Sequence, residues 1–163
     1  MNGSDVLAVL LIAAALANGL MAGASLDRSV VQLPARRKIG VPAYSAYSVA
    51  HELEGVGLIW YPVLGLGSAL LTIAAAVLAA ATGISLLNGS PIYLAATAAV
   101  MHSVATARAA PLNFRQRSAQ GDEAQLARII DSFEKWQAAR AVLQLASFAG
   151  TVVALAGLGR VWN

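Results

Sequence analysis

His51 and Glu54 are the two side chains in this sequence best suited to acid–base chemistry. On a helix, residues three apart share a face, so the carboxylate would raise the basicity of the imidazole or fix its tautomer. An imidazole held in this way can act as a general base. The same spacing is also typical of a solvated His–Glu pair on an exposed helix, and the spacing alone does not decide between these interpretations.

A stripe of polar residues runs through the last apolar segment of the chain in steps of three and four. It consists of Gln137, Arg140, Gln144, Ser147 and Thr151. These steps place its members on one face of a helix whose other faces are Ala, Val, Leu and Phe. Because hydrocarbon offers polar groups no hydrogen-bond partner, we expect the stripe to face other helices or a cavity. Arg140 is then a candidate to stabilise an anion, although an arginine at the end of a span can also snorkel to the interface.

Three further side chains are candidates to bind a ligand. They are Tyr47, Asn113 and Trp136. The two aromatic rings could stack on a planar molecule, and the amide could orient a phenol or a carbonyl. Each has a simpler alternative, since Tyr and Trp also mark membrane interfaces and Asn113 could cap the turn after Pro111. His102, in the middle of an apolar segment, is more typical of a hydrogen-bonded packing residue.

The composition indicates which elements position these side chains. Of the 163 residues, 58% are hydrophobic and 12% are charged, whereas soluble domains carry about twice that charged fraction. Apolar segments long enough to cross a bilayer lie at about 6–26, 56–80, 92–110 and 139–158. We therefore predict an all-α fold in which residues 1–163 form a single domain, an integral membrane up-and-down four-helix bundle. The first segment could also be a signal peptide, but residues 1–5 lack Lys and Arg, which favours a retained helix.

The basic residues predict the orientation of this bundle. All Lys and Arg except Arg160 lie in or beside the connection between the first two spans and the connection between the last two. The positive-inside rule places both connections in the cytoplasm and both termini outside, with the protein in the inner (plasma) membrane. Within the first connection, aromatic and ionisable residues follow three–four spacing from Pro42 to Tyr61. This spacing predicts that the second helix begins before the membrane and continues into it.

The candidate residues converge at the cytoplasmic end of such a bundle. They are Tyr47, His51, Glu54, Asn113, Trp136 and Arg140. We expect a pocket there that holds a lipophilic, aromatic and partly anionic small molecule.

Several other functions are not supported by the sequence. There is no Cys, which excludes thiolate metal sites and thiol nucleophiles, and a di-iron bundle would need more carboxylates than the single His51-x-x-Glu54 pattern supplies. His51 and His102 would differ in depth by ~20 Å, too far for a shared haem. We expect no metal and no cofactor. The basic charge reflects membrane topology, so the expected partner is the lipid bilayer and not nucleic acid, while a homo-oligomer is left open.

Two runs of residues resemble a known family. Residues 106–113 contain Pro111-Leu112-Asn113, and residues 133–144 contain Trp136 followed four residues later by Arg140. These Pro-x-Asn and Trp-x-x-x-Arg patterns resemble those of anthrone-oxygenase-like membrane proteins, and residues 24–27 and 33–36 are similar to bacterial members. The resemblance implies a four-helix membrane fold and, for some members, cofactor-independent oxidation of an anthrone to an anthraquinone. The positions that match the family are Asn113, Trp136 and Arg140.

Two classes of function are consistent with these features. In an oxygenase, His51 would remove the acidic proton of an anthrone and Arg140 would stabilise the resulting oxyanion. In a non-catalytic membrane subunit or lipophile-binding protein, the same polar stripe would bind a quinone, a lipid or a partner helix. Oxygen uptake with an anthrone separates the two, because only the enzyme consumes oxygen.

Overall fold

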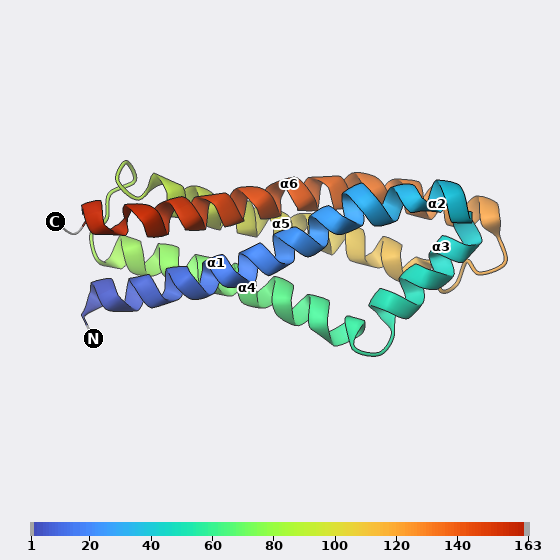
Figure 1. Cartoon of the computed structure of the whole chain (residues 1–163), viewed down its shortest axis with the longest axis horizontal. Coiled ribbons are helices and arrows are strands. Elements are labelled where there is room, and N and C mark those ends of the chain that lie inside the picture. The colour runs from blue at the N-terminus through green and yellow to red at the C-terminus, as the bar shows by residue number, and fades with distance from the viewer. Residues whose placement is uncertain (1, 162–163) are drawn as a thin grey trace.

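The computed structural model describes residues 2–161, with side chains described from residue 2 to residue 158. Across these residues the chain is helical and contains no strand, which confirms the predicted all-α class. The long helices are α1 (Gly3–Asp27), α4 (Gly57–Ala81), α5 (Ser90–Arg115) and α6 (Glu123–Val161). They lie side by side along the long axis of the molecule (Figure 1). α1 and α5 each contact both α4 and α6, so the four helices form a closed ring around a common interior.

Three helical segments are long and apolar enough to cross a membrane. Within the described residues these segments are Gly3–Ile39, Gly57–Ala81 and Glu123–Leu158. They contain the predicted spans 6–26 and 139–158, and the predicted span 56–80 except for residue 56. The predicted span 92–110 lies in α5, which is long enough but is not among them. Its apolar residues are mainly Ala, and it carries polar side chains such as His102, Thr106 and Arg108.

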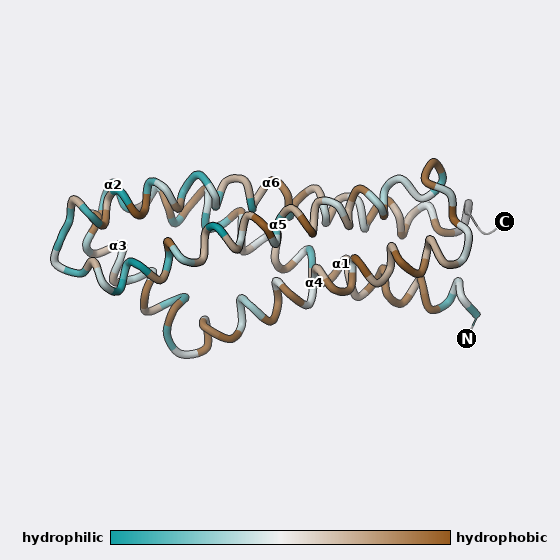
Figure 2. The backbone as a smooth tube through the Cα atoms, turned by 180° about the vertical axis from the view of Figure 1, so that it is seen from behind, coloured by the Kyte–Doolittle hydropathy of each residue, from teal (hydrophilic) through white to brown (hydrophobic). Residues whose placement is uncertain are grey.

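The two ends of the molecule differ in polarity. The first described residue and the end of α6 lie at one end, and the connections between α1 and α4 and between α5 and α6 lie at the other (Figure 1). Hydrophilic residues are concentrated around α2 and α3 at this second end, whereas hydrophobic residues dominate the opposite half (Figure 2). Both long connections therefore lie at one end, as the distribution of basic residues predicts.

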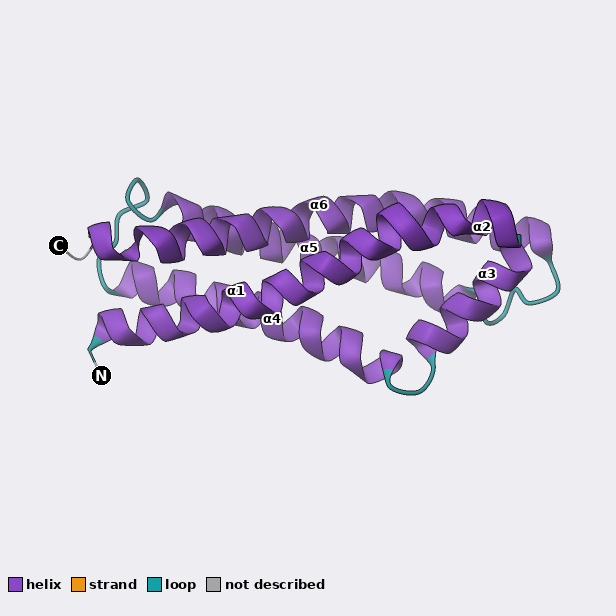
Figure 3. Ribbon diagram, in the orientation of Figure 1, coloured by secondary structure: helices purple, strands orange, loops and turns teal. Residues whose placement is uncertain are grey.

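The connection between α1 and α4 is itself helical (Figure 3). α1 continues through a π-helical turn, η1 (Arg28–Gln32), into α2 (Leu33–Ile39), and the chain reverses at Gly40, whose φ of 84° favours glycine. α3 (Val41–Ser48) then runs back and ends in a second π-helical turn, η2 (Val49–Leu53).

A turn separates η2 from α4, so the prediction of one continuous helix from Pro42 to Tyr61 is wrong. Glu54 is extended (φ −128°, ψ 161°) and Gly55 has a φ of 53°, a conformation that ordinary side chains rarely adopt. α4 begins close against η2, because a Cβ atom added to Gly57 would overlap the carbonyl oxygen of His51. His51 and Glu54 consequently do not share a helical face.

The predicted inward orientation of the polar stripe is confirmed. Gln137, Gln144, Ser147 and Thr151 of α6 are buried, as are Ser68 and Thr72 of α4. A hydrogen-bond network centred on Asn18 of α1 joins the helices. The side-chain nitrogen of Asn18 donates to Thr72 Oγ1 (2.8 Å). The side-chain oxygen of Asn18 accepts from Gln144 Nε2 (2.8 Å) and from Ser147 Oγ (3.3 Å). This network fixes the rotation of three helices about their axes, because each buried polar group needs its partner.

Candidate functional site

A cavity of about 360 Å³ lies between the four long helices, in the half of the molecule nearer to α2 and α3. Its volume lies within the range of small-molecule sites. Apolar side chains such as Met21, Leu53 and Phe133 form much of its wall. The polar side chains of the lining are Ser25, Arg28, Gln32, Glu52, Tyr61, His102, Ser103, Thr106, Asn113, Gln137 and Arg140.

A buried ion pair closes one end of the cavity. The guanidinium of Arg28, the first residue of η1, pairs with the carboxylate of Glu52 in η2, and both side chains are largely buried, at 12% and 8% exposure. Arg28 also lies over the ring of Phe133, 4.2 Å from its centroid. Asn113 of α5 donates from Nδ2 to Glu52 Oε2 (2.8 Å). The opposite charges of Arg28 and Glu52 neutralise each other. The Asn113 amide supplies a further hydrogen bond to the Glu52 carboxylate.

Arg140 contributes a positive charge with no such compensation. Its Nη1 donates to Gln137 Oε1 (3.1 Å), and the Gln137 amide donates in turn to the carbonyl oxygen of Ser25 (3.3 Å). Its Nε is buried without a hydrogen-bond partner, and among the described residues no carboxylate forms an ion pair with it. A guanidinium stays charged in proteins. The cavity therefore presents one positive charge with an unsatisfied donor.

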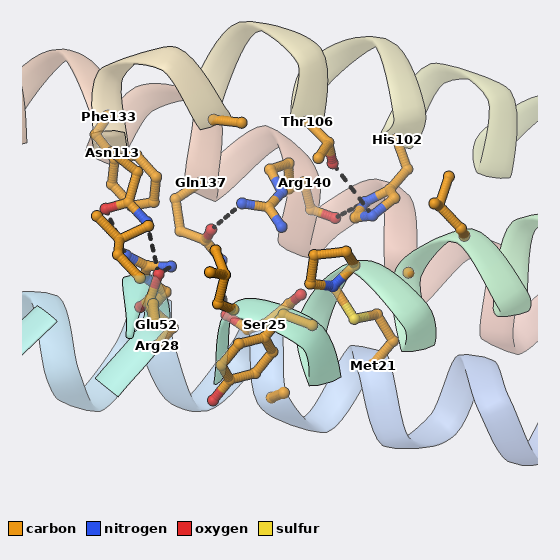
Figure 4. Close-up of a pocket in the computed structure, with 18 of the residues that line it drawn as sticks. Met21, Ser25, Arg28, Glu52, His102, Thr106, Asn113, Phe133, Gln137 and Arg140 are labelled. Atoms are coloured by element: carbon orange, nitrogen blue, oxygen red, sulfur yellow. Dashed lines mark hydrogen bonds and ion pairs between the residues drawn. The ribbon is translucent and has the colours of Figure 1, made fainter. Parts of the chain in front are cut away.

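His102 lines the opposite end of the cavity from the ion pair (Figure 4). The ring Nδ1 lies 3.4 Å from the carbonyl oxygen of Arg140, and Nε2 lies 3.4 Å from Thr106 Oγ1. A carbonyl oxygen can only accept, which assigns the proton of a neutral ring to Nδ1 and leaves the Nε2 lone pair facing the Thr106 hydroxyl. His102 is thus an imidazole beside Arg140 whose Nε2 lone pair accepts from the Thr106 hydroxyl.

Of the six residues predicted to form the site, Asn113 and Arg140 line the cavity. His51 and Tyr47 lie outside its lining, in an aromatic cluster. The Tyr61 hydroxyl is 3.2 Å from His51 Nε2, and the Tyr47 ring stacks on the imidazole with centroids 5.4 Å apart. Tyr61 itself lines the cavity, so this cluster lies behind the cavity wall. Burial raises the pKa of the neighbouring Tyr44 phenol, which therefore stays protonated at neutral pH.

Glu54 and Trp136 do not line the cavity. Glu54 lies exposed in the turn before α4, and Trp136 is 39% exposed on the outer side of α6. Trp136 lies between Phe133 and Gln137 in sequence, and those two residues take the inward positions. The expected convergence of all six residues on one pocket is therefore wrong. The π-helical turn and Gly55 replace the continuous helix on which the positions of His51 and Glu54 depended.

The structure adds residues to the site that sequence patterns did not select as ligand contacts. Gln137 lies on the polar stripe that the sequence predicts, and Arg28 lies two residues beyond the first predicted span. No sequence pattern selects Glu52, because a continuous α-helix would place His51 and Glu54, and not Glu52, on its inward face. Its ion pair with Arg28 joins residues 24 positions apart.

Among the described residues, no three His, Asp or Glu side chains gather closely enough to hold a metal ion. Comparison of the chain with family models, with curated proteins and with solved structures finds no match. Function is therefore inferred from the geometry and charge of the cavity.

Proposed function

We propose that this protein is an integral membrane protein in which α1, α4, α5 and α6 cross the bilayer as an up-and-down four-helix bundle. Three segments that are long and apolar enough to span support this proposal. α5 supports it by its close packing, since an added Cβ atom at Gly150 of α6 would lie 2.9 Å from the Cβ of Ala95. Small residues that let helices approach closely are typical of membrane bundles. The basic end with α2 and α3 would lie on the cytoplasmic side of the plasma membrane.

Single cysteines test this topology cleanly, because the natural chain contains none. Asn88→Cys lies in the turn between α4 and α5, and Ser118→Cys lies in the connection between α5 and α6; both positions are exposed. In intact cells, a membrane-impermeant maleimide should label Asn88→Cys, while Ser118→Cys should react only after the membrane is permeabilised. Labelling of Ser118→Cys in intact cells would reverse the proposed orientation.

We further propose that the cavity binds a lipophilic aromatic molecule that carries an anionic or strongly polarised oxygen. The observation that carries this proposal is Arg140, which lines the apolar-walled cavity with a buried, unpartnered Nε and, among the described residues, forms no ion pair with a carboxylate. Burying an uncompensated charge is costly, so such a site gains stability when an anion enters it. Phe133 and the apolar wall would contact the planar body of the molecule.

Filling the cavity with a side chain should abolish binding. Ala110 of α5 lines the cavity, whereas Ala107, three residues earlier on the same helix, is exposed and outside the lining. Ala110→Trp should weaken binding of the fluorescent probe anthracene carboxylate by more than about tenfold, because the indole occupies the space that the probe needs. Ala107→Trp is the matched control and should bind as the unmodified protein does. Equal affinities in the two variants, measured in nanodiscs, would place the binding site elsewhere.

Catalysis is the second candidate, in line with the resemblance to anthrone-oxygenase-like proteins. Its support is the placement of His102 beside Arg140, both in the cavity lining. His102 would take the acidic proton of an anthrone, Arg140 would stabilise the oxyanion, and the carbanion would react with O₂. Loss of water from the resulting peroxide gives the anthraquinone, so one O₂ is consumed for each anthrone, with no added cofactor.

The two histidines separate this enzyme from a binding protein. If the protein is an oxygenase, His102→Gln should lower anthrone-dependent oxygen uptake by about 10²-fold, since a positioned base contributes at least that much. His51→Gln, outside the cavity lining, should retain most of the activity. Oxygen consumption and anthraquinone formation are measured together for both variants. If the unmodified protein binds anthrone but consumes no oxygen, the oxygenase proposal is wrong and the binding proposal stands.

A further inference from the structure

The fixed charges in the cavity specify the charge of its ligand. Resting on the proposed binding function, we infer that the cavity selects amphiphiles with a single negative charge, and that Glu52 sets this selectivity by neutralising Arg28. Among the described residues, three Arg and Glu side chains line the cavity: Arg28, Glu52 and Arg140. The first two form an ion pair and cancel, which leaves the single positive charge of Arg140.

A ligand with one negative charge makes the occupied cavity neutral. A ligand with two leaves one negative charge buried without a counter-charge, because the charge of Arg28 is already balanced by Glu52. His102 adds no charge in its neutral form, and its contacts are a carbonyl oxygen and a hydroxyl. The cavity should therefore bind a monoanion more tightly than a neutral molecule or a dianion of the same shape.

The shape of the cavity explains why the ligand is amphiphilic. The exposed residues of its lining are Leu58, Pro62, Leu66, Ser103 and Phe114, all on α4 or α5. Three of them are large apolar side chains, with exposures of 42% for Leu58, 64% for Leu66 and 45% for Phe114. Arg140 lies on α6, and its guanidinium points into the cavity (Figure 4). An occupant that holds its anion at Arg140 would thus extend its apolar body towards a hydrophobic opening between α4 and α5.

Glu52 determines the net charge of the cavity lining, and two neighbouring side chains hold it in place. It pairs with Arg28 and accepts from Asn113 Nδ2 at 2.8 Å. Glu52→Gln keeps nearly the same shape and retains one oxygen acceptor, but it releases the charge of Arg28. The cavity would then carry two positive charges, and a dianion would become the ligand that neutralises it.

Two probes of equal size test this inference in the full chain, purified in nanodiscs of zwitterionic lipid. They are anthracene dicarboxylate and its monoamide, which differ by one charge. The unmodified protein should bind the monoamide at least ~30-fold more tightly, the penalty expected for an unpaired buried charge. Glu52→Gln should reduce this preference at least ~tenfold. Glu134→Gln, which removes a half-exposed carboxylate outside the cavity, should leave the preference unchanged.

A double variant keeps the test decisive if Glu52→Gln folds poorly. Arg28→Gln combined with Glu52→Gln removes both charges, restores a single positive charge and should restore the monoanion preference. Equal binding of the two probes by the unmodified protein would overturn the inference and leave the proposed binding function standing. So would a preference that Glu52→Gln does not change. Failure of both probes, and of neutral anthracene methanol, to bind would overturn the proposed function itself.

Discussion

Arg140→Gln should weaken binding of anthracene carboxylate by roughly 30- to 3,000-fold, the range expected when one partner of a buried charge pair is removed. Arg140 is the charged group in the cavity lining that has no counter-charge among the described residues, and its Nε has no hydrogen-bond partner. Glutamine still reaches towards Gln137 but supplies neither the charge nor the planar fork. The measurement is an equilibrium titration of each variant in nanodiscs.

Two controls separate a direct contact from general electrostatic attraction. Arg140→Lys should recover only part of the affinity, because a point charge does not reproduce the paired donors of a guanidinium. Arg108→Gln removes an exposed arginine of α5 that is outside the cavity lining, and it should bind the probe normally. Neutral anthracene methanol should bind to Arg140→Gln as it binds to the unmodified protein. An equal loss of affinity in Arg108→Gln and Arg140→Gln would show that the probe responds only to the overall charge.

Arg28→Gln should lower the free energy of unfolding by roughly 3–5 kcal/mol, because it leaves the carboxylate of Glu52 buried without a positive partner. Glu52 is 8% exposed and keeps only the hydrogen bond from Asn113 when Arg28 is removed. The substitution also removes the contact between the guanidinium and the ring of Phe133. Reversible unfolding by dodecyl sulfate in mixed micelles gives the free energy of unfolding for each variant.

The same measurement on two further variants identifies the cause. Adding Glu52→Gln to Arg28→Gln should recover most of the loss, since no buried charge then remains unpaired. Arg36→Gln breaks ion pairs with Asp131 and Glu134, whose side chains are 62% and 38% exposed, and should cost no more than about 1 kcal/mol. If Arg28→Gln costs no more than Arg36→Gln, the Arg28–Glu52 pair contributes little to the stability of the fold.

The features predicted correctly from the sequence depend on helical periodicity over long distances. The steps from Gln137 to Thr151 continue for four helical turns, so their common face is defined even when single residues deviate. The charge distribution was equally informative, because basic residues in two connections require those connections to share one end of the bundle.

The features that sequence patterns missed depend on local departures from the α-helix. A π-helical turn contains an extra residue, so it rotates every following side chain relative to an ideal helix. Two such turns, η1 and η2, lie in the connection between α1 and α4, and η2 carries Glu52 at a position that ideal periodicity does not predict. Gly55 then ends the helical path and leaves Glu54 exposed in the turn, whereas Glu52, within η2, pairs with Arg28.

The position of a bound ligand tests the proposed function most directly. The measurement is a crystal structure of the protein in a lipid phase with a bromine-substituted anthracene carboxylate, in which anomalous scattering locates the bromine. We expect the carboxylate within hydrogen-bond distance of Arg140 Nε and the ring system directed towards Leu66 and Phe114, between α4 and α5. A ligand bound outside the cavity, with Arg140 Nε still without a partner, would contradict the proposal that this cavity is a site for lipophilic anions.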